Sequence, residues 1–484
     1  MKAALEKSTY RQLADDLQEL IESKTLRVCD KMPSLRRLAR DRGVSLTTVQ
    51  SAYEVLESRG LIEARPRSGF FVCPRIKLED RLPVMPQGRN RTAKVERPDF
   101  YEEVMSAINN PEIVPLGCAV PSDEVYPTKT LARLSNAALR EHGSSAYRYT
   151  ICPGRQELRH QIARRLMTAG ATVTEDEVIT TTGATEALVV ALTAIAQPGD
   201  LVAVEMPTFF GILRIIETLK LKVVEIPVCP IQGMNLDFLD EVTGEHRIKA
   251  CIVQPNFQNP TGSVMGKSDR ERLATLAAER EFAIIEDDLY GELPFEGKRP
   301  TSMLAHDKDG RVIHCGGVSK ILSPALRVGW LVSERYYSQL EAVKSVSFPA
   351  SSTLSEMVVA AFFADGGLDR HLRRIRQIYQ DKSMHMREAV FANFPEGTRV
   401  NAPTGGFVLW VQLPRQYDSE QLALDALNEG ISVAPGTIFT ASDSLRNCLR
   451  LNCGFGSDER IPKAIKRLGQ LLATSSKKSF GPGR

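Results

Sequence analysis

The feature that most constrains the fold is a regular alternation of short β-branched runs with segments of helical periodicity, beginning near residue 99. The clearest runs are "DEVITTT" (176–182), "DLVAVE" (200–205), "KVVEIPV" (222–228), "KACIVQP" (249–255), "FAIIEDD" (282–288), "RVIHCGG" (311–317) and "RVGWLV" (327–332). Strands separated by helices are joined by crossovers, which make neighbouring strands parallel and place helices on both faces of the sheet. The pattern predicts an α/β body on a mostly parallel sheet.

The rest of the chain divides into three parts. Helical patterns mixed with "FVLWVQLP", "ISVAP" and "CLRLNC" in the last hundred residues predict a smaller C-terminal α/β subdomain. Residues 74–98 hold four prolines and no sustained period, which is typical of a linker. We therefore expect a patterned N-terminal domain over 8–73, a linker over 74–98 and an α/β domain over 99–475.

Charge and composition limit the classes of function and the partners that are expected for this chain. Residues 1–98 hold 20 Lys and Arg against 13 Asp and Glu, whereas the whole chain has a net charge of only +3, so a nucleic-acid partner is favoured for the basic end. No apolar run reaches the roughly 18–20 residues of a membrane span, and the N-terminus does not resemble a signal peptide. The nine cysteines lack CxxC spacing. We expect a cytoplasmic protein with no membrane partner, no disulfides and no metal site.

The first seventy residues have the pattern of three helices and a hairpin. The first helix would bury Leu13 and Leu17, and the second would begin after Ser34 as its N-cap and end at Gly43. A third helix, in "VSLTTVQSAYEVLESRG", would turn its polar side chains outward, and "LIEARPRSGFFV" would form two strands around a basic tip. Helix, glycine-containing turn and helix is the helix-turn-helix spacing, although a small helical bundle with a solvated polar face has the same periodicity.

The stretch "MPSLRRLARDRGVSLTTVQSAYEVLESRGLIEARPRSGFFV" resembles the GntR-type winged helix over almost all of residues 8–73. The resemblance implies binding to double-stranded DNA, because arginines and hydroxyls suit phosphate and groove-edge contacts. Leu46 and Gln50 depart from the basic residues that are common at those positions, which leaves base preference open. The implied DNA-binding residues are Arg36, Ser45, Thr47, Thr48, Arg65, Arg67 and Gly69.

Four motifs of the body carry chemistry. "TTGATEAL" (181–188) closes a strand and opens a helix whose first amides can face an anion. "PNFQNPTG" (255–262) is a turn at a strand end, and "IIEDDLYGEL" (284–293) ends an apolar strand in acids. "HCGGVSKILSPALRVGW" (314–330) sets a lysine among small neighbours, where desolvation lowers a lysine pKa and frees a neutral nucleophile. Each motif alone is also compatible with an ordinary turn or with solvated acids.

The order of the four motifs resembles the pyridoxal-phosphate aminotransferases of fold type I, class I/II, over about residues 110–470. The resemblance implies pyridoxal 5'-phosphate as cofactor, Lys320 as the Schiff-base lysine and Asp287 as partner of the pyridinium nitrogen. Arg450, in "CLRLNCG", would grip a substrate carboxylate. The remaining implied cofactor residues are Tyr149 (from the partner subunit), Gly183, Ala184, Thr185, Phe209, Asn259, Tyr290, Ser319 and Arg327.

One position departs from that pattern. Gly317 stands three residues before Lys320, where related proteins commonly place a Ser or Thr that donates to the cofactor phosphate. The missing hydroxyl implies a looser and more exchangeable cofactor.

A GntR-type winged helix joined to an aminotransferase-like body is the arrangement of the MocR subfamily of transcription regulators. The resemblance implies a DNA-binding regulator that senses pyridoxal phosphate, an amino compound or both, and a head-to-tail homodimer. Two alternatives remain open from the sequence: an active aminotransferase that carries a DNA-binding domain, and an architectural DNA-binding dimer whose body has lost its cofactor.

Overall fold

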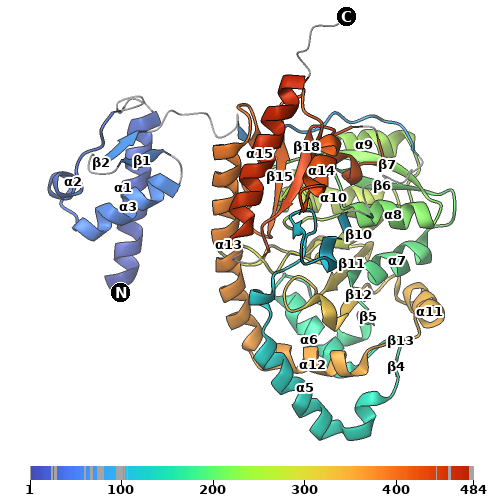
Figure 1. Ribbon diagram of the computed structural model, residues 1–484. Coiled ribbons are helices and arrows are strands. Elements are labelled where there is room, and N and C mark those ends of the chain that lie inside the picture. Colours follow the sequence, from blue (N-terminus) through green and yellow to red (C-terminus); the bar gives the residue numbers. More distant parts are fainter. Residues whose placement is uncertain are drawn as a thin grey trace, which may run out of the picture. The chain divides into compact units, whose positions relative to one another are not determined.

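The computed structural model divides the chain into two compact units, residues 1–81 and residues 82–484 (Figure 1). We call them the N-terminal unit and the body. The structure describes residues 2–22, 26, 30–58, 61–65, 69–72, 81–93, 102, 104, 105, 107–442, 444–455 and 459–478.

The N-terminal unit is a three-helix domain with a two-stranded hairpin. Its elements are α1 (Lys2–Glu22), α2 (Leu35–Arg42), α3 (Leu46–Ser58), β1 (Ile62–Arg65) and β2 (Gly69–Val72). The two strands pair antiparallel, with Ile62 opposite Val72. This arrangement is the helix-turn-helix with wing that the sequence predicts.

Local chemistry explains where these helices begin and end. The Ser34 hydroxyl accepts the Arg37 amide at 3.3 Å and caps α2, and Gly43 ends it in the left-handed region at φ 64°. The Tyr53 hydroxyl, from α3, donates to the Pro33 carbonyl at 2.7 Å and ties the third helix to the start of the second. The predicted apolar faces of α1 and α3 form one core, which includes Leu13, Ala14, Leu17, Ile21, Val49, Ala52, Tyr53 and Leu56.

The body is built on an eight-stranded sheet in the order β5-β12-β11-β10-β9-β6-β7-β8. Pairing is parallel throughout its middle, while β12 is antiparallel to both neighbours and β8 is antiparallel to β7. All seven predicted strands are present. The strands are β5 (Val178–Thr181), β6 (Leu201–Met206), β7 (Lys222–Cys229), β8 (Gly233–Met234), β9 (Ala250–Val253), β10 (Ala283–Asp287), β11 (Val312–Gly317) and β12 (Gly329–Val332).

Helices cover both faces of this sheet (Figure 1). One face packs on α7 (Ala184–Ile195), α8 (Phe210–Thr218) and α11 (Tyr337–Ser347) through a core that includes Leu188, Ile212 and Leu340. The other face packs on α9 (Leu236–Glu245) and α10 (Lys267–Glu279) through Leu239 and Leu273. Both cores bury near-continuous Val and Ile runs, as expected for a sheet that is buried on both sides.

A smaller subdomain is built mainly from the C-terminal part of the chain. Its four-stranded sheet has the order β14-β15-β18-β17, and a short parallel pair joins β16 to β3. Its strands and the two-stranded pair β13-β4 are β3 (Val114–Pro115), β4 (Thr150–Ile151), β13 (Ala350–Ser351), β14 (Arg399–Val400), β15 (Val408–Gln412), β16 (Ile431–Ser432), β17 (Ala434–Pro435) and β18 (Cys448–Asn452). The remaining helices are α5 (Thr128–His142), α6 (Gln156–Met167), α12 (Thr353–Ala364), α13 (Gly367–Asn393), α14 (Ser419–Leu427) and α15 (Arg460–Lys478).

Part of the expected linker lies against the body. We call residues 82–93 the strap. Its Val84 amide donates to the Gln412 side chain at 2.9 Å, and Ala93 forms an antiparallel bridge with Val223 at the edge of β7. At Gly88 the strap comes so close that an added Cβ would lie 2.7 Å from both the Phe238 ring and Pro227. These contacts hold the strap to the body over its whole length.

Two further findings concern membrane-spanning helices and cysteines. Among the helices that the structure describes, none is long and apolar enough to cross a membrane. Every cysteine in the described part of the chain is a free thiol.

Candidate cofactor and substrate site

The candidate site lies where three parallel strands end together. β10 pairs in parallel with β9 on one side and with β11 on the other, so the segments that follow these strands leave the sheet at one edge. Asn259 follows β9, Asp287 ends β10, and Lys320 comes three residues after β11. The carboxyl edge of such a sheet is where α/β proteins bind ligands. The sheet order therefore brings the predicted motifs to one place.

Lys320 has the properties of an activated amine. The Lys320 side chain is half-buried, and its Nζ donates to the Ala119 carbonyl at 2.6 Å. Burial and, to a smaller extent, the nearby positive charge of Arg450 lower the pKa of Lys320 to about 8, while the Asp287 carboxylate opposes this shift. A larger fraction of the amine is therefore neutral near physiological pH than for a lysine in water.

Asp287 is buried, and only one of its two carboxylate oxygens has a hydrogen-bond partner among the described residues. The Gln254 amide donates to Oδ2 at 2.6 Å, whereas Oδ1 is buried without a hydrogen-bond partner among the described residues. Burial raises the pKa of Asp287 to about 6; the Gln254 hydrogen bond acts against this rise. A buried acceptor of this kind is costly unless a ligand supplies its donor.

Arg450 is buried between two aromatic rings, 5.5 Å from the centroid of Phe210 and 5.0 Å from that of Phe439. Its Nη1 donates to Asn259 Oδ1 at 3.0 Å and its Nη2 donates to the Gly117 carbonyl. Burial lowers the pKa of Arg450. Both terminal nitrogens have protein partners, so a carboxylate that binds both of them competes with the Gly117 carbonyl, while Nε is buried without a partner among the described residues.

An anion cradle lies at the start of α7. Gly183 is its N-cap residue, at φ 121°, a value that favours glycine. A Cβ at Gly183 would lie 2.9 Å from the Arg327 guanidinium, and a Cβ at Gly317 would lie 3.5 Å from the Ala184 nitrogen. The backbone amides at the start of α7 therefore lie close to the Arg327 guanidinium, and a phosphate placed between them would be stabilised by both. Thr185 at this end is exposed and Ser319 is half-buried.

These groups fit a phosphorylated pyridine aldehyde. Asp287 Oδ1 is an acceptor for a protonated ring nitrogen, and the Tyr290 hydroxyl, also buried without a described partner, is a donor for a ring oxygen. The Tyr290 pKa is raised by burial, which keeps its proton in place. Lys320 supplies the amine for the aldehyde, and the cradle at Gly183 receives the phosphate. Each polar group of such a cofactor therefore has a counterpart among the described residues.

Two predicted site residues lie at the margin. Phe209 is the N-cap residue of α8 and half-buried, and its ring is 4.8 Å from that of Phe210. Tyr149 stands beside β4 with 89% of its surface exposed, and so it is not drawn into the site of its own chain. Exposure of this degree is compatible with a role across a subunit interface.

Several of the predicted DNA-binding residues are exposed on the N-terminal unit. Arg36, Thr47 and Gly69 are exposed. The Ser45 hydroxyl accepts the Thr48 amide at 3.0 Å and therefore caps α3. Of the other predicted contacts, Thr48 is half-buried, Arg67 lies outside the described residues, and only the backbone of Arg65 is described.

Sequence reasoning missed the layer behind the cofactor residues. The Gln254 side chain donates to Asp287 and accepts the backbone amide of Asn259 at 3.1 Å. The backbone amide of Gln254 donates to the Glu205 carboxylate at 3.0 Å. Burial raises the pKa of Glu205 to about 8. One signal was available: Gln254 is a polar residue at the end of the apolar run "KACIVQP", next to the strand that ends in Asp287.

One group of side chains has the spacing of a metal site. Glu286, Asp288 and His314 are buried with their ligand atoms within 4.8 Å of one another. His314 is 2.8 Å from Glu286, and Arg299 donates to Asp288 at 2.6 Å. Both carboxylates therefore already have partners, and we interpret these three residues as part of the buried core next to the site.

Comparison with known families gives matches to both units. Residues 114–468 match the family of aminotransferases of class I and II, and residues 9–72 match the gntR family of bacterial regulatory proteins. The HTH-type transcriptional regulator YjiR of Escherichia coli, itself uncharacterized, is 37% identical over 96% of this chain and 98% of its own length.

Two aminotransferases resemble the body. The aromatic-amino-acid aminotransferase 1 of Thermococcus litoralis is 30% identical over 78% of this chain and 92% of its own length. The crystal structure of the α-aminoadipate aminotransferase LysN of Thermus thermophilus, in complex with N-(5'-phosphopyridoxyl)-L-leucine, matches with a TM-score of 0.72 and 28% identity over 78% of this chain and 98% of that one. With a gntR-family domain followed by an aminotransferase class I and II domain, the chain belongs to the MocR-type transcriptional regulators.

Proposed function

We propose that this protein is a DNA-binding transcription regulator whose body carries pyridoxal 5'-phosphate on Lys320 and senses an amino compound there. The observation that supports this function is that one chain has a helix-turn-helix unit followed by a body in which Asp287, Tyr290, Arg450 and Lys320 lie in one site. Chromosomal DNA as target places the protein in the cytoplasm.

The body uses pyridoxal 5'-phosphate as its cofactor. When bound, this group withdraws electrons from the carbon next to an attached amine. Lys320, kept partly neutral by burial, would bond to its aldehyde carbon. Asp287 Oδ1 would accept from the ring nitrogen, Tyr290 and Asn259 would serve the ring oxygen, and Phe209 would pack on the ring. Arg327, Ser319 and the amides of Gly183, Ala184 and Thr185 would hold the phosphate.

The effector we propose is an amine that carries a carboxylate. Arg450 is a buried cation, and because its charge lowers the Lys320 pKa, the two groups are close enough to act on each other. An amino acid that exchanges its amine with Lys320 and sets its carboxylate on Arg450 would displace the Gly117 carbonyl. Gly117 and Ala119, the carbonyl partner of Lys320, lie in one short segment, so the ligand would move both.

We also propose a head-to-tail homodimer. Large apolar and aromatic side chains are exposed around the β4–β13 pair: Tyr147, Tyr149, Ile151, Val346 and Phe348. Such a patch is typical of a subunit interface. A second copy covering it would bring Tyr149 to the phosphate of the partner's cofactor, and two winged helices would then read two half-sites of a DNA duplex.

Absorbance spectroscopy of the purified full-length protein tests this function. We expect a yellow chromophore that borohydride fixes to the protein in a 1:1 ratio and that is absent from Lys320→Ala. Lys267→Ala is the matched control, because Lys267 is an exposed lysine on α10 that only pairs with Glu271. A wild-type protein without a lysine-dependent chromophore would rule out the cofactor.

A true aminotransferase remains the second candidate, because Lys320, Asp287, Tyr290 and Arg450 are all in place. The two functions differ in turnover. An enzyme passes the amino group from an amino acid to a keto acid over many cycles, whereas a sensor stops after one exchange. Measuring keto-acid formation per cofactor over time distinguishes them.

A further inference from the structure

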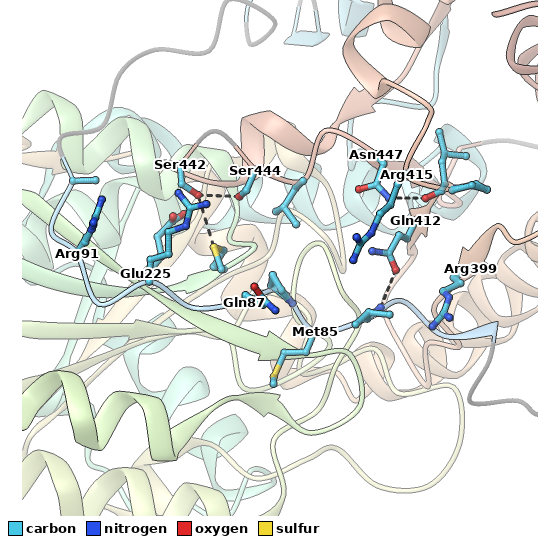
Figure 2. A pocket seen from close by; sticks show the side chains of 18 of the residues that line it. Met85, Gln87, Arg91, Glu225, Arg399, Gln412, Arg415, Ser442, Ser444 and Asn447 are labelled. Carbon is cyan, nitrogen blue, oxygen red and sulfur yellow. Dashed lines mark hydrogen bonds between the residues drawn. The ribbon is translucent and has the colours of Figure 1, made fainter. Parts of the chain in front are cut away.

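A cavity lies beside the strap, and none of the candidate cofactor residues lines it (Figure 2). Its volume is about 1000 Å³, at the upper end of the range of small-molecule sites. The strap forms one wall with Met85, Gln87 and Arg91. Arg399 and Gln412 of the small C-terminal sheet, together with Arg415 in the turn after β15, form another wall, as Figure 2 shows. The segment around Ser442 and Ser444 closes a further side.

The described lining of this cavity is strongly cationic. It includes Arg89, Arg91, Arg399 and Arg415, while Glu225 is its one acid. Glu225 already has partners outside the cavity lining, since its Oε1 accepts the Thr440 hydroxyl and the Ala441 amide, each at 2.7 Å. Within the part of the chain that the structure describes, no carboxylate pairs with the guanidinium groups of Arg89, Arg91 or Arg415. Four like charges around one space repel one another unless an anion enters it.

The neutral groups of the lining suit an organic anion. Gln87, Thr92 and Ser444 supply hydrogen-bond donors and acceptors, and Met85, Leu413, Pro414 and Leu445 supply apolar surface. The chemistry is that of a ligand with negative groups on an organic framework, because a bare inorganic ion fills only a small part of this volume.

The cavity also joins elements that are distant in sequence. Arg399 Nη1 donates to the Leu82 carbonyl at 3.3 Å, and the Gln412 side chain accepts the Val84 amide, so the cavity walls hold the first residues of the strap. At the far end Ala93 is bonded to Val223 of β7. A ligand between these points would add contacts to both the strap and the body.

We propose that this cavity is a binding site for a metabolite-sized organic anion bearing phosphate or carboxylate groups, and that its occupancy fastens the strap to the body. The site is separate from the Lys320 site and does not depend on the proposed cofactor. The strap begins at the boundary between the two units, at residue 82, so an anion bound there stabilises the first residues of the body.

Hydrogen exchange of the full-length protein tests the proposal. The protein is first saturated with pyridoxal phosphate, so that added anions do not enter the cradle at α7, and the excess cofactor, itself an organic phosphate, is removed by gel filtration. Citrate or AMP is then added at constant ionic strength set with NaCl. At about ten times its Kd, a bound probe slows exchange of the strap amides by about tenfold, because opening then also requires release of the ligand. The amides of Val84 and Ala93 are the reporters.

Two variants make the result specific. Arg415→Gln removes one charge of the cavity at a residue that is exposed and makes no hydrogen bond or ion pair among the described residues. Arg373→Gln, an exposed arginine of α13 outside the cavity, is the matched control. We expect slowing by at least one probe in the wild type and in Arg373→Gln, and loss of that slowing in Arg415→Gln with an unchanged Tm.

Three results would overturn the proposal. The first is an absence of slowing by both probes, and the second is equal slowing in wild type and Arg415→Gln. The third is that Arg415→Gln weakens binding of a mixed-sequence DNA duplex as much as it weakens probe binding, which would make the cavity a DNA contact instead.

Discussion

Gln254 donates its side-chain amide to Oδ2 of Asp287 over 2.6 Å, and the two residues sit side by side at the ends of the paired strands β9 and β10. Because the bond favours the ionised carboxylate and leaves Oδ1 open, Gln254 prepares Asp287 to receive a cationic ring nitrogen. Gln254 is thus a positioning residue for the cofactor.

Replacing Gln254 tests this relationship. Gln254→Leu removes a hydrogen bond to a buried carboxylate, a contact worth about 1.5–3 kcal/mol, so cofactor affinity should fall by about 10- to 100-fold. Titration of cofactor-free protein with pyridoxal phosphate measures it. Gln421→Leu is the control, because Gln421 makes the same kind of bond to Asp425 on the exposed face of α14. Equal affinities in the two variants would show that Gln254 plays no part.

The pH profile of cofactor attachment reports on Lys320. Attachment requires the neutral amine, and the pKa of Lys320 is lowered to about 8, so the rate of borohydride-trapped attachment should rise with pH to half its maximum near pH 8. Arg450→Gln removes a neighbouring positive charge that lowers this pKa, so its profile should shift to higher pH. A wild-type midpoint near that of a free lysine, about 10.4, would contradict the environment described for Lys320.

Gly317→Ser should tighten cofactor binding. The new Cβ would lie 3.5 Å from the Ala184 nitrogen and 3.3 Å from the Val328 carbonyl, so the hydroxyl reaches the cradle after a small adjustment. One added hydrogen bond is worth about 0.5–1.5 kcal/mol, which predicts an affinity gain of about twofold to tenfold. Gly317→Ala is the control, since it adds the Cβ without the hydroxyl. If both variants bind the cofactor like the wild type, the glycine does not explain a loose site.

Subunit mixing tests the role of Tyr149. If Tyr149 serves the partner's site, Tyr149→Ala and Lys320→Ala should each lower cofactor occupancy alone. A heterodimer of the two variants combines both changes in one site and leaves the other site complete. Mixing should therefore restore high-affinity binding at half of the sites of the heterodimer, as measured by equilibrium titration. No recovery on mixing, with heterodimers verified by mass spectrometry, would place Tyr149 outside the partner's site.

Local features of the chain were predictable in detail. The seven β-branched runs are strands of one sheet. Helix α2 begins after Ser34 and ends at Gly43, and the apolar periodicity of α1 and α3 marks the buried faces of these helices. These properties depend on neighbouring residues only, since caps and periodicity follow from the local backbone and from burial on one side.

Contacts between distant segments were not predictable in the same way. The Ala119 carbonyl that receives Lys320 is 201 residues away, and Gln254 is 33 residues from Asp287. Strand periodicity gives the face of a side chain but not its partner on the next strand. The strap is a further example: its prolines and charges are typical of a linker, yet Gly88 and Ala93 fit against the body.

The central claim is that the cofactor site controls DNA binding. The DNA affinity of the full-length protein tests this claim most directly. A duplex selected from a random pool serves as target, and its Kd is measured with cofactor-free protein, with pyridoxal phosphate, and with the cofactor plus each of a panel of amino acids. Coupling between sites is commonly about 1–3 kcal/mol, so we expect at least one addition to change Kd by about fivefold or more in wild type and not in Lys320→Ala. A Kd that neither cofactor nor any amino acid changes would contradict the account.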